Sequence, residues 1–171
     1  MVLEKHIFLI GFMGVGKTTT SECLSKKLQA EELDTDGMIV AKEGRSIADI
    51  FAEEGEPYFR QTETDLLDEL AKREPCIISC GGGMAMREEN VAKMKQSGTV
   101  VFLTATPETV YGRVKDFDDR PLLNGNMNIP YIRGLMETRE PKYRGAADIV
   151  TVTDGLTPGQ VADEIILSLQ A

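Results

Sequence analysis

The sequence predicts an α/β fold in which a largely parallel sheet is covered by helices. Strand-like and helix-like segments alternate along the 171 residues, and such alternation favours parallel strands with helices on both faces. The first unit is the clearest, because an apolar run at residues 6–10 is followed by a glycine-rich loop and then by a helical stripe. The length suits one domain, residues 1–171, with a sizeable core.

The glycine-rich loop at residues 11–18, GFMGVGKT, has the pattern G-x-x-x-x-G-K-[ST] of a phosphate-binding loop, or P-loop. Its glycines let backbone N–H groups turn toward phosphate oxygens, and the next helix adds the positive end of its dipole. Lys17 is expected to reach the β- and γ-phosphates, and Thr18 to place its hydroxyl on magnesium. The alternative is a glycine-rich turn with a solvated lysine, which the flanking strand and helix disfavour.

The elements after the P-loop can be predicted in order. The helix that follows has Thr20, Leu24 and Leu28 at four-residue spacing on its buried face. Residues 33–36 are expected to form a very short strand that ends in acids. Two short helices should follow at about 38–42 and 46–54, and Ser46 with Asp49 is close to a capping box.

The middle of the chain should supply the longest helix and two further strands. A helix is expected over about 57–72, with Pro57 in its first turn. Residues 75–79 read as a strand, a helix at 88–96 should stop at Gly98, and 99–103 is the next strand. Thr106 is expected to cap another helix. The buried face of the 57–72 helix should comprise Phe59, Leu66, Leu67 and Leu70.

The last third contains a polar loop at 116–128, which is too long for a bare connector and therefore favours a lid. A helix at about 129–143, a strand at 149–153 and a helix at 158–169 should complete the fold. The last helix should bury Ala162, Ile165, Ile166 and Leu169.

Composition excludes several classes of function. The net charge of −9 makes nucleic acid an unexpected partner, and a bound anion must be held by local positive charge. A single histidine, His6, excludes a Ser-His-Asp triad and a histidine-rich metal site. Neither a signal-peptide pattern nor a run of membrane-spanning length occurs, so no membrane partner is expected.

The three cysteines predict reduced thiols in a cytoplasmic protein. Cys76 and Cys80 would lie about 13 Å apart in an extended strand, too far for a disulfide. With Cys23 the count is odd, and no C-x-x-C pattern is present.

Two polar groups are expected at the carboxyl ends of strands, where ligands bind in open α/β sheets. Asp34 and Asp36 would lie on one face of an extended strand and point toward the P-loop; the alternative is an acidic helix cap. Residues 81–83, GGG, follow another strand and allow close approach of the backbone to a ligand. A simple flexible turn is the alternative there.

Three arginines are candidates for binding an anion, because a guanidinium grips carboxylate or phosphate in a bidentate manner. Arg60 precedes Glu63 by three residues, so Glu63 can orient it on a helix face. Arg120 lies in the polar loop, and Arg139 lies in the helix after it. Each could instead be a solvated charge, and Arg60 an ordinary surface ion pair.

Taken together, these motifs resemble the shikimate kinase family. The resemblance covers essentially the whole chain with similar spacing; many enzymes share the P-loop, but the combined set is specific to this family. The matching runs are GFMGVGKT at 11–18, LDTD at 33–36, GRSIADIF at 44–51, Gly55-Glu56, Phe59-Arg60 with Glu63, GGG at 81–83, RPLL at 120–123, and Arg139 with Tyr143-Arg144.

The resemblance implies a P-loop NTPase of the nucleoside-monophosphate-kinase type. Its fold would be a three-layer αβα arrangement with a five-stranded parallel sheet in the order 2-3-1-4-5. The domain would include a substrate-binding region at about 34–63 and a lid at about 113–127. The implied reaction moves the γ-phosphoryl of MgATP to the 3-hydroxyl of shikimate, giving shikimate 3-phosphate and ADP in aromatic amino-acid biosynthesis. The family is usually monomeric.

The resemblance also implies a role for individual residues. Asp36 would bind the substrate hydroxyls and serve as base, with Lys17 and Arg120 as the other catalytic residues. The residues implied for the shikimate site are Asp36, Arg60, Gly81, Gly82, Gly83 and Arg139. Magnesium would be held by Thr18, Asp34 and Ser79. The residues implied for ATP are Gly14, Val15, Gly16, Lys17, Thr18, Thr19, Arg113, Arg120 and Pro158, with Arg113 and Pro158 beside adenine.

Other functions stay open at this stage. The chain could be another small-molecule P-loop kinase, for gluconate or a nucleoside monophosphate, or a catalytically silent paralogue that only binds ATP. The absence of an N-K-x-D motif argues against a GTPase switch. Asp116, Asp118 and Asp119 beside Arg120 are unexpected, because acids near transferring phosphates repel them unless they point away or are paired.

Overall fold

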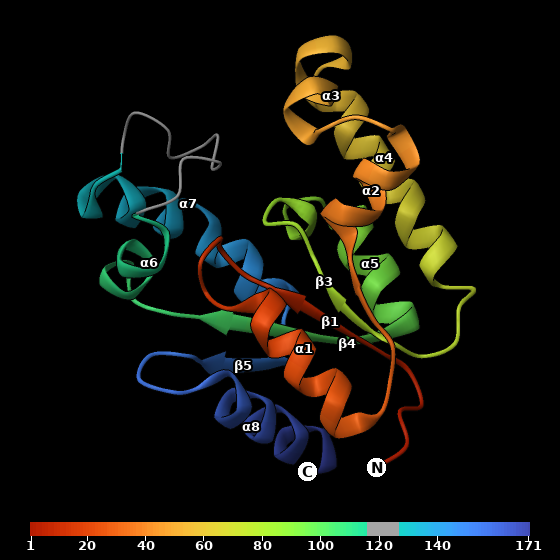
Figure 1. Cartoon of the computed structure of the whole chain (residues 1–171), viewed down its shortest axis with the longest axis vertical. Coiled ribbons are helices and arrows are strands. Elements are labelled where there is room, and N and C mark those ends of the chain that lie inside the picture. The colour runs from red at the N-terminus through yellow and green to blue at the C-terminus, as the bar shows by residue number, and fades with distance from the viewer. Residues whose placement is uncertain (116–126) are drawn as a thin grey trace.

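The structure is a computed structural model that describes residues 1–115 and 127–171. Within these ranges, five parallel strands form one sheet in the order β2-β3-β1-β4-β5, with helices on both faces (Figure 1). The predicted fold class and strand order are therefore confirmed. The strands are β1 (His6–Ile10), β2 (Glu32–Asp34), β3 (Ile77–Ser79), β4 (Gly98–Thr104) and β5 (Ile149–Val152).

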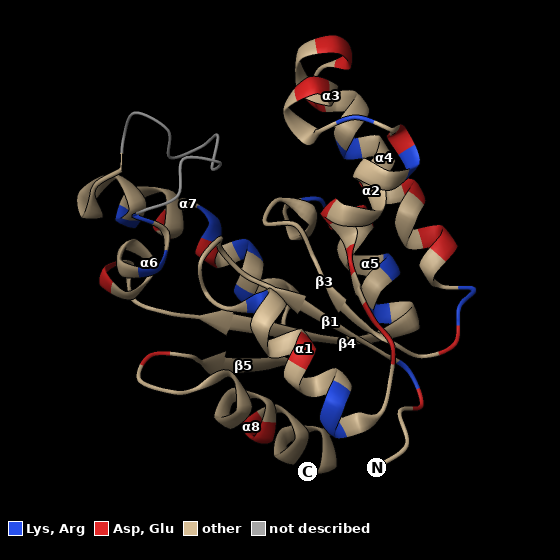
Figure 2. Ribbon diagram, in the orientation of Figure 1, with Lys and Arg blue, Asp and Glu red and all other residues tan. Residues whose placement is uncertain are grey.

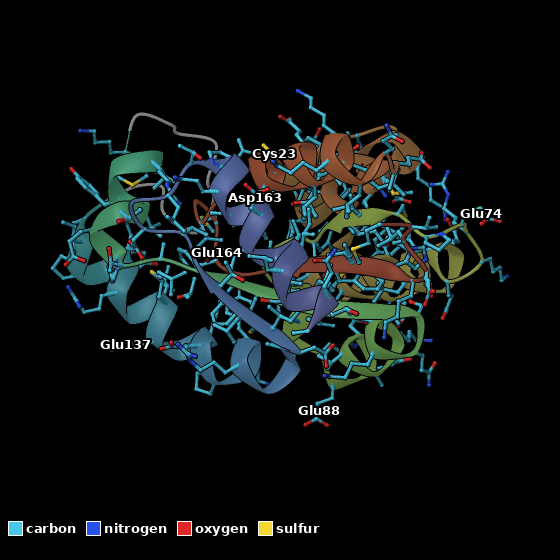
Figure 3. All side chains as sticks on the ribbon, turned by 90° about the horizontal axis from the view of Figure 1, so that it is seen from below. Cys23, Glu74, Glu88, Glu137, Asp163 and Glu164 are labelled. Carbon is cyan, nitrogen blue, oxygen red and sulfur yellow. The ribbon has the colours of Figure 1, made fainter. Side chains whose placement is uncertain are left out.

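Helices cover both faces of the sheet and explain its apolar composition. In the view from below, α1 and α8 lie on one face, whereas α5 and α7 lie on the other (Figure 3). All five residues of central β1 are consequently buried. The helices are α1 (Lys17–Leu28), α2 (Thr35–Glu43), α3 (Ile47–Glu54), α4 (Glu56–Leu70), α5 (Glu88–Ser97), α6 (Pro107–Val114), α7 (Ile129–Ala146) and α8 (Pro158–Gln170), and a 3₁₀ turn, η1, spans Met84–Met86.

The buried helix faces largely match those predicted from spacing. Thr20, Leu24 and Leu28 are buried on α1, and all four apolar positions predicted for α4 are buried. The face of α8 is rotated slightly from the prediction. Its buried residues are Val161, Ala162 and Ile165, whereas Ile166 and Leu169 are only partly buried.

The predicted strand at 33–36 is wrong in its second half. β2 ends at Asp34, and Asp36 already lies in the first turn of α2. The reason is that the Asp34 side chain caps this helix by accepting a hydrogen bond from the Gly37 N–H at 3.3 Å. The two acids therefore do not share one face of a strand, and the alternative of a helix cap holds for Asp34.

Gly98 follows the last residue of α5 as its C-cap, as predicted, and it is also the first residue of β4, with an extended φ of −166°. A Cβ at this position would lie 2.5 Å from the His6 carbonyl oxygen. Glycine is thus needed here for close approach of β4 to β1.

Other boundaries shift by a turn or less, and α7 extends past the predicted end at 143 to Ala146. The 3₁₀ turn η1 was not predicted. Most of the predicted polar loop, including Arg120 and the three neighbouring aspartates, lies outside the described residues. None of the helices within residues 1–115 and 127–171 has both the length and the apolar character needed to cross a bilayer.

Candidate active site

The P-loop lies between the end of β1 and the start of α1. Gly14 and Gly16 have φ values of 82° and 101°, which only glycine adopts without strain. Gly16 is the N-cap of α1 and offers no side chain to the first-turn N–H groups, so these donors point to an incoming anion. The Lys17 ammonium lies over the loop and donates to the carbonyl oxygens of Gly11 at 2.6 Å and Phe12 at 3.1 Å.

A cleft of about 810 Å³ opens beside the P-loop. Leu9, Ser79 and Asp34 are adjacent in the register of β1, β3 and β2, which brings the carboxyl ends of these strands to one edge. The three predicted metal residues and most of the predicted P-loop and glycine residues therefore share one cavity, whereas Val15, Gly83, Arg60 and Arg139 do not line it. Its lining includes Gly14, Gly16, Lys17, Thr18, Thr19, Asp34, Asp36, Ser79, Gly81 and Gly82.

The triple-glycine turn at 81–83 is surrounded by the predicted substrate residues. A Cβ on Gly81 would lie 2.6 Å from Asp36 Oδ1, and a Cβ on Gly82 would lie 3.2 Å from Arg139 Nη1. A Cβ on Gly83 would lie 2.7 Å from Arg60 Cζ. The turn thus brings together one carboxylate and two guanidinium groups from three different elements, and any larger residue would displace them.

Glu63 orients Arg60, as the spacing of the two residues predicted. The Arg60 Nη1 donates to Glu63 Oε1 at 2.8 Å, and a weaker contact joins Arg60 Nε to Glu56 at 3.3 Å. Glu63 is fully buried, and its other oxygen, Oε2, has no hydrogen-bond partner within the described part of the chain. Burial raises the pKa of Glu63 from its ordinary value of 4.5 to about 7, although Arg60 opposes this shift.

Two further contacts, which sequence spacing did not predict, hold the glycine turn in place. The Thr35 hydroxyl accepts a hydrogen bond from the Gly81 N–H at 2.9 Å. The Tyr143 hydroxyl on α7 donates to the Gly82 carbonyl at 2.5 Å, and the Tyr143 ring stacks on Phe102 at 5.2 Å. Burial also raises the pKa of the Tyr143 hydroxyl above its ordinary value. Its match to the family motif was the only sequence signal for Tyr143.

A second cavity, of about 480 Å³, also borders the P-loop. It is lined by Gly14, Gly16, Thr19, Arg113 and Pro158, among others. The Arg113 Nη1 donates to the carbonyl of Gly14 at 3.0 Å and to the Thr153 hydroxyl at 3.3 Å. Arg113 and Pro158 thus lie close to the P-loop.

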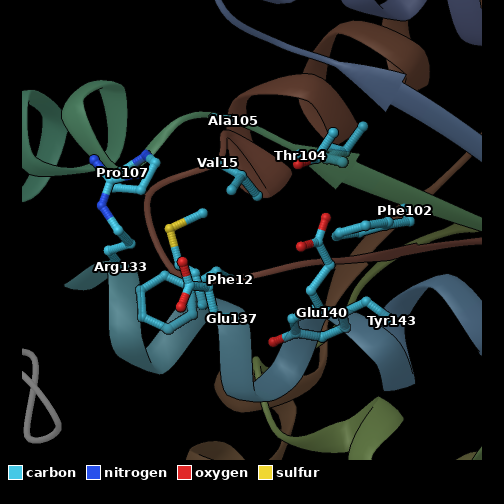
Figure 4. Close-up of a pocket in the computed structure, with 12 residues that line it drawn as sticks. Phe12, Val15, Phe102, Thr104, Ala105, Pro107, Arg133, Glu137, Glu140 and Tyr143 are labelled. Carbon is cyan, nitrogen blue, oxygen red and sulfur yellow. The ribbon is translucent and has the colours of Figure 1, made fainter. Parts of the chain in front are cut away.

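A smaller cavity of about 240 Å³ lies against α7, with Phe12, Phe102 and Tyr143 along its wall and Glu137 and Glu140 beside them (Figure 4). It holds one predicted ATP residue, Val15, and none of the predicted shikimate residues. Figure 2 shows basic stretches along α7 and acidic stretches at the tips of α3 and α4.

A family model described as shikimate kinase matches residues 13–170. The chain belongs to the shikimate kinase family. Its activity is accordingly that of a shikimate kinase, an ATP-dependent phosphotransferase, and members of this family typically use MgATP. The family match favours shikimate kinase over the alternative of a kinase for gluconate or a nucleoside monophosphate.

Individual relatives agree with the family match. A shikimate kinase from Dehalococcoides mccartyi is 41% identical over 170 residues, covering 99% of this chain and 96% of the relative. The solved structure of shikimate kinase from Acinetobacter baumannii in complex with shikimate is 35% identical, with a TM-score of 0.91 over 97% of this chain and 93% of that one.

A gluconokinase from Sinorhizobium meliloti shares the fold with a TM-score of 0.63, but it is only 15% identical over 99% of this chain and 94% of its own. This likeness concerns the fold alone.

Proposed function

We propose that the cleft transfers the γ-phosphoryl of MgATP to the 3-hydroxyl of shikimate. The observation that supports this most strongly is the arrangement of Asp36, Arg139 and Arg60 around the triple-glycine turn, at the edge of the cleft that the P-loop opens. A hydroxylated ring acid needs a carboxylate for its hydroxyls and guanidinium groups for its carboxylate, and both stand at this turn.

ATP would bind across the P-loop. Its phosphates would contact Lys17 and the backbone N–H groups of residues 14–19, and adenine would occupy the second cavity beside Arg113 and Pro158. The uncapped start of α1 favours the phosphate charge there.

The residues of the cleft fit a magnesium ion. Thr18, Asp34 and Ser79 line the cleft with oxygen atoms, the ligands that this hard cation prefers. In proteins, magnesium is commonly held by one or two carboxylates together with substrate phosphates and water. In residues 1–115 and 127–171 no group of three or more His, Cys, Asp or Glu side chains forms a protein-only cage. When bound, the ion would neutralise charge on the phosphate oxygens.

Asp36 would accept the proton of the attacking hydroxyl, and Arg60 and Arg139 would fix the ring through its carboxylate. Because phosphoryl transfer needs alignment and charge neutralisation more than covalent help from the protein, positioning is the main task of these groups. Lys17 would supply positive charge at the transferring phosphate, and Arg120 would add to it from the lid at about 113–127.

We also propose that the chain functions as one domain and as a monomer. We propose a cytoplasmic location as well, because the three cysteines form no disulfide. Light scattering on the purified protein tests the monomer, because a stable dimer would give twice the mass.

ADP release at fixed MgATP tests the proposed reaction. We expect release to depend on shikimate and to stay at background with gluconate or with a nucleoside monophosphate. ³¹P–¹H correlation spectra of the product should place the new phosphate on the 3-oxygen. Tight ATP binding without shikimate-dependent ADP release would instead support a silent paralogue.

A further inference from the structure

We propose that Thr64 and Asn90 are positioning residues for the shikimate site, acting through a buried hydrogen-bond network that joins α4 to the triple-glycine turn. The inference rests on the proposed roles of Arg60 and residues 81–83 in holding the shikimate carboxylate. Neither Thr64 nor Asn90 lines the cleft, so both would act through other groups.

On one side, the network holds the backbone of the glycine turn. The Asn90 Nδ2 on α5 donates to the Met84 carbonyl at 3.0 Å. The Met84 N–H in turn donates to the Gly81 carbonyl, and the Met86 N–H to the Gly83 carbonyl, each at 3.1 Å. Asn90 therefore anchors the 3₁₀ turn η1, which fixes two carbonyls of the glycine turn.

On the other side, the network holds α4. The Thr64 hydroxyl donates to Asn90 Oδ1 at 2.6 Å, and the Arg87 Nη1 donates to the Thr64 oxygen at 2.8 Å and to the Arg60 carbonyl at 3.3 Å. A hydroxyl has one proton, and Asn90 Oδ1 lies nearer to Thr64 than the Arg60 carbonyl at 3.1 Å. Thr64 thus links the turn of α4 that carries Arg60 to Asn90, the residue that anchors the glycine turn through η1.

The network sets the position of the Arg60 guanidinium relative to Gly83. The Arg60 guanidinium packs against Gly83, where a Cβ would lie 2.7 Å from Arg60 Cζ. Apolar packing between α4 and α5 is not directional, whereas a hydrogen bond of 2.6 Å fixes one relative position. A small shift of α4 would move Arg60 relative to the turn and weaken the grip on a carboxylate.

Burial makes Thr64 and Asn90 depend on each other for their hydrogen bonds. Thr64 and Asn90 are each 1% exposed, so water has little access to replace a lost partner. Removing one group leaves the other unsatisfied, and the network can relax by moving the helix. The hydrogen bonds of this network join α4, η1 and α5 and include no residue of the P-loop, so the effect should fall on shikimate and spare ATP.

A matched set of threonine variants tests this proposal. Thr64→Val keeps the branched shape but loses the hydroxyl, and should raise the KM for shikimate about 5- to 10-fold while the KM for ATP changes less than about twofold. Thr64→Ser keeps the hydroxyl and should restore the KM for shikimate to within about twofold of wild type. Thr62→Val is the control on the same helix, because the Thr62 hydroxyl donates to the Tyr58 carbonyl within α4; both KM values should match wild type.

Arg87→Met provides a second variant in case Thr64→Val does not fold. Arg87 is partly exposed, and its replacement removes the donors to Thr64 and to the Arg60 carbonyl. It should raise the KM for shikimate about 2- to 5-fold and leave the KM for ATP unchanged.

The proposal is overturned if folded Thr64→Val matches Thr64→Ser in the KM for shikimate, or if the KM values for both substrates rise together, as in a general loss of structure. An unchanged KM for shikimate in Arg87→Met overturns it as well. Failure of the proposed function would look different, because wild type itself would then show no shikimate-dependent turnover.

Discussion

Asp34 and Asp36 are separated by one residue, yet the chain places them in different surroundings. Asp34 ends β2, is exposed and caps α2 through Oδ2. Asp36 is half-buried and faces Gly81 at the end of β3. An exposed carboxylate suits a hydrated cation, whereas one against the glycine turn suits a substrate hydroxyl.

Asp36→Asn should therefore abolish phosphoryl transfer almost completely while ATP binding is retained, because the amide cannot accept the hydroxyl proton. Shikimate-dependent ADP release and ATP titration by calorimetry measure the two effects. Turnover at the wild-type rate would exclude Asp36 as the base.

Glu63 should make stability depend on pH. Its pKa lies at about 7 in the folded protein and at the ordinary 4.5 when exposed, so the folded state binds more protons between these values. The Glu63 contribution then makes the free energy of unfolding fall as pH rises from about 4.5 to about 7. Glu63→Gln cannot titrate, and its stability relative to wild type should rise over this range.

Urea denaturation of both proteins at several pH values checks this difference, and the comparison cancels the other titrating groups. A difference that stays constant, or that falls with rising pH, would contradict the raised pKa of Glu63.

At the scale of elements, the glycine turn is held by its neighbours on both sides. The Tyr143 hydroxyl bonds the Gly82 carbonyl from α7, which also carries Arg139, and Asn90 holds η1 from α5. The position of α7 relative to the turn should therefore affect how Arg139 meets the substrate.

Tyr143→Phe should raise the KM for shikimate about 3- to 10-fold, because the partly buried Gly82 carbonyl loses its donor while ring stacking on Phe102 is kept. Steady-state kinetics with each substrate varied measures this effect. Tyr131→Phe on the same helix is the control, since Tyr131 is exposed. Equal KM values in wild type and Tyr143→Phe would show that the hydroxyl has no positioning role.

Sequence patterns predicted the elements and site groups that depend on local spacing. The P-loop follows from its glycines and Lys17, and the contact between Arg60 and Glu63 follows from positions three apart on a helix. The turn into α2 was missed because an acid at a strand end and an acid at a helix cap look alike in sequence.

Contacts between distant segments could not be predicted from spacing. Thr64 and Asn90 are 26 residues apart, and Tyr143 and Gly82 are 61 apart, so only packing of α4, α5 and α7 around the turn brings them together. Gly98 is a similar case, because glycine is needed there only through the close approach of β1, which is distant in the sequence.

At the scale of the whole molecule, the proposed function requires an acidic chain of net charge −9 to bind two anionic substrates. Its site concentrates positive groups on a few elements, with Lys17 at the start of α1, Arg60 on α4 and Arg139 on α7. Lys17 lies on the P-loop, whereas Arg60 and Arg139 lie at the triple-glycine turn, which agrees with the proposal that they bind different substrates.

Arg120, which lies outside the described residues, would complete this proposal from the proposed lid. Arg120→Ala should lower kcat by about 10³-fold or more, because an arginine at the transferring phosphate stabilises charge in the transition state. The dissociation constant for ATP should change only a few-fold. Single-turnover kinetics and ATP titration separate the two effects, and equal losses in both would indicate a plain binding role.

The most direct test of the account is a crystal structure of the complex with shikimate and ADP. The account predicts that the shikimate carboxylate contacts Arg60 and Arg139, that a ring hydroxyl contacts Asp36, and that the ADP phosphates lie on the P-loop. A shikimate molecule bound away from the triple-glycine turn, or turned with its carboxylate toward Lys17, would contradict it.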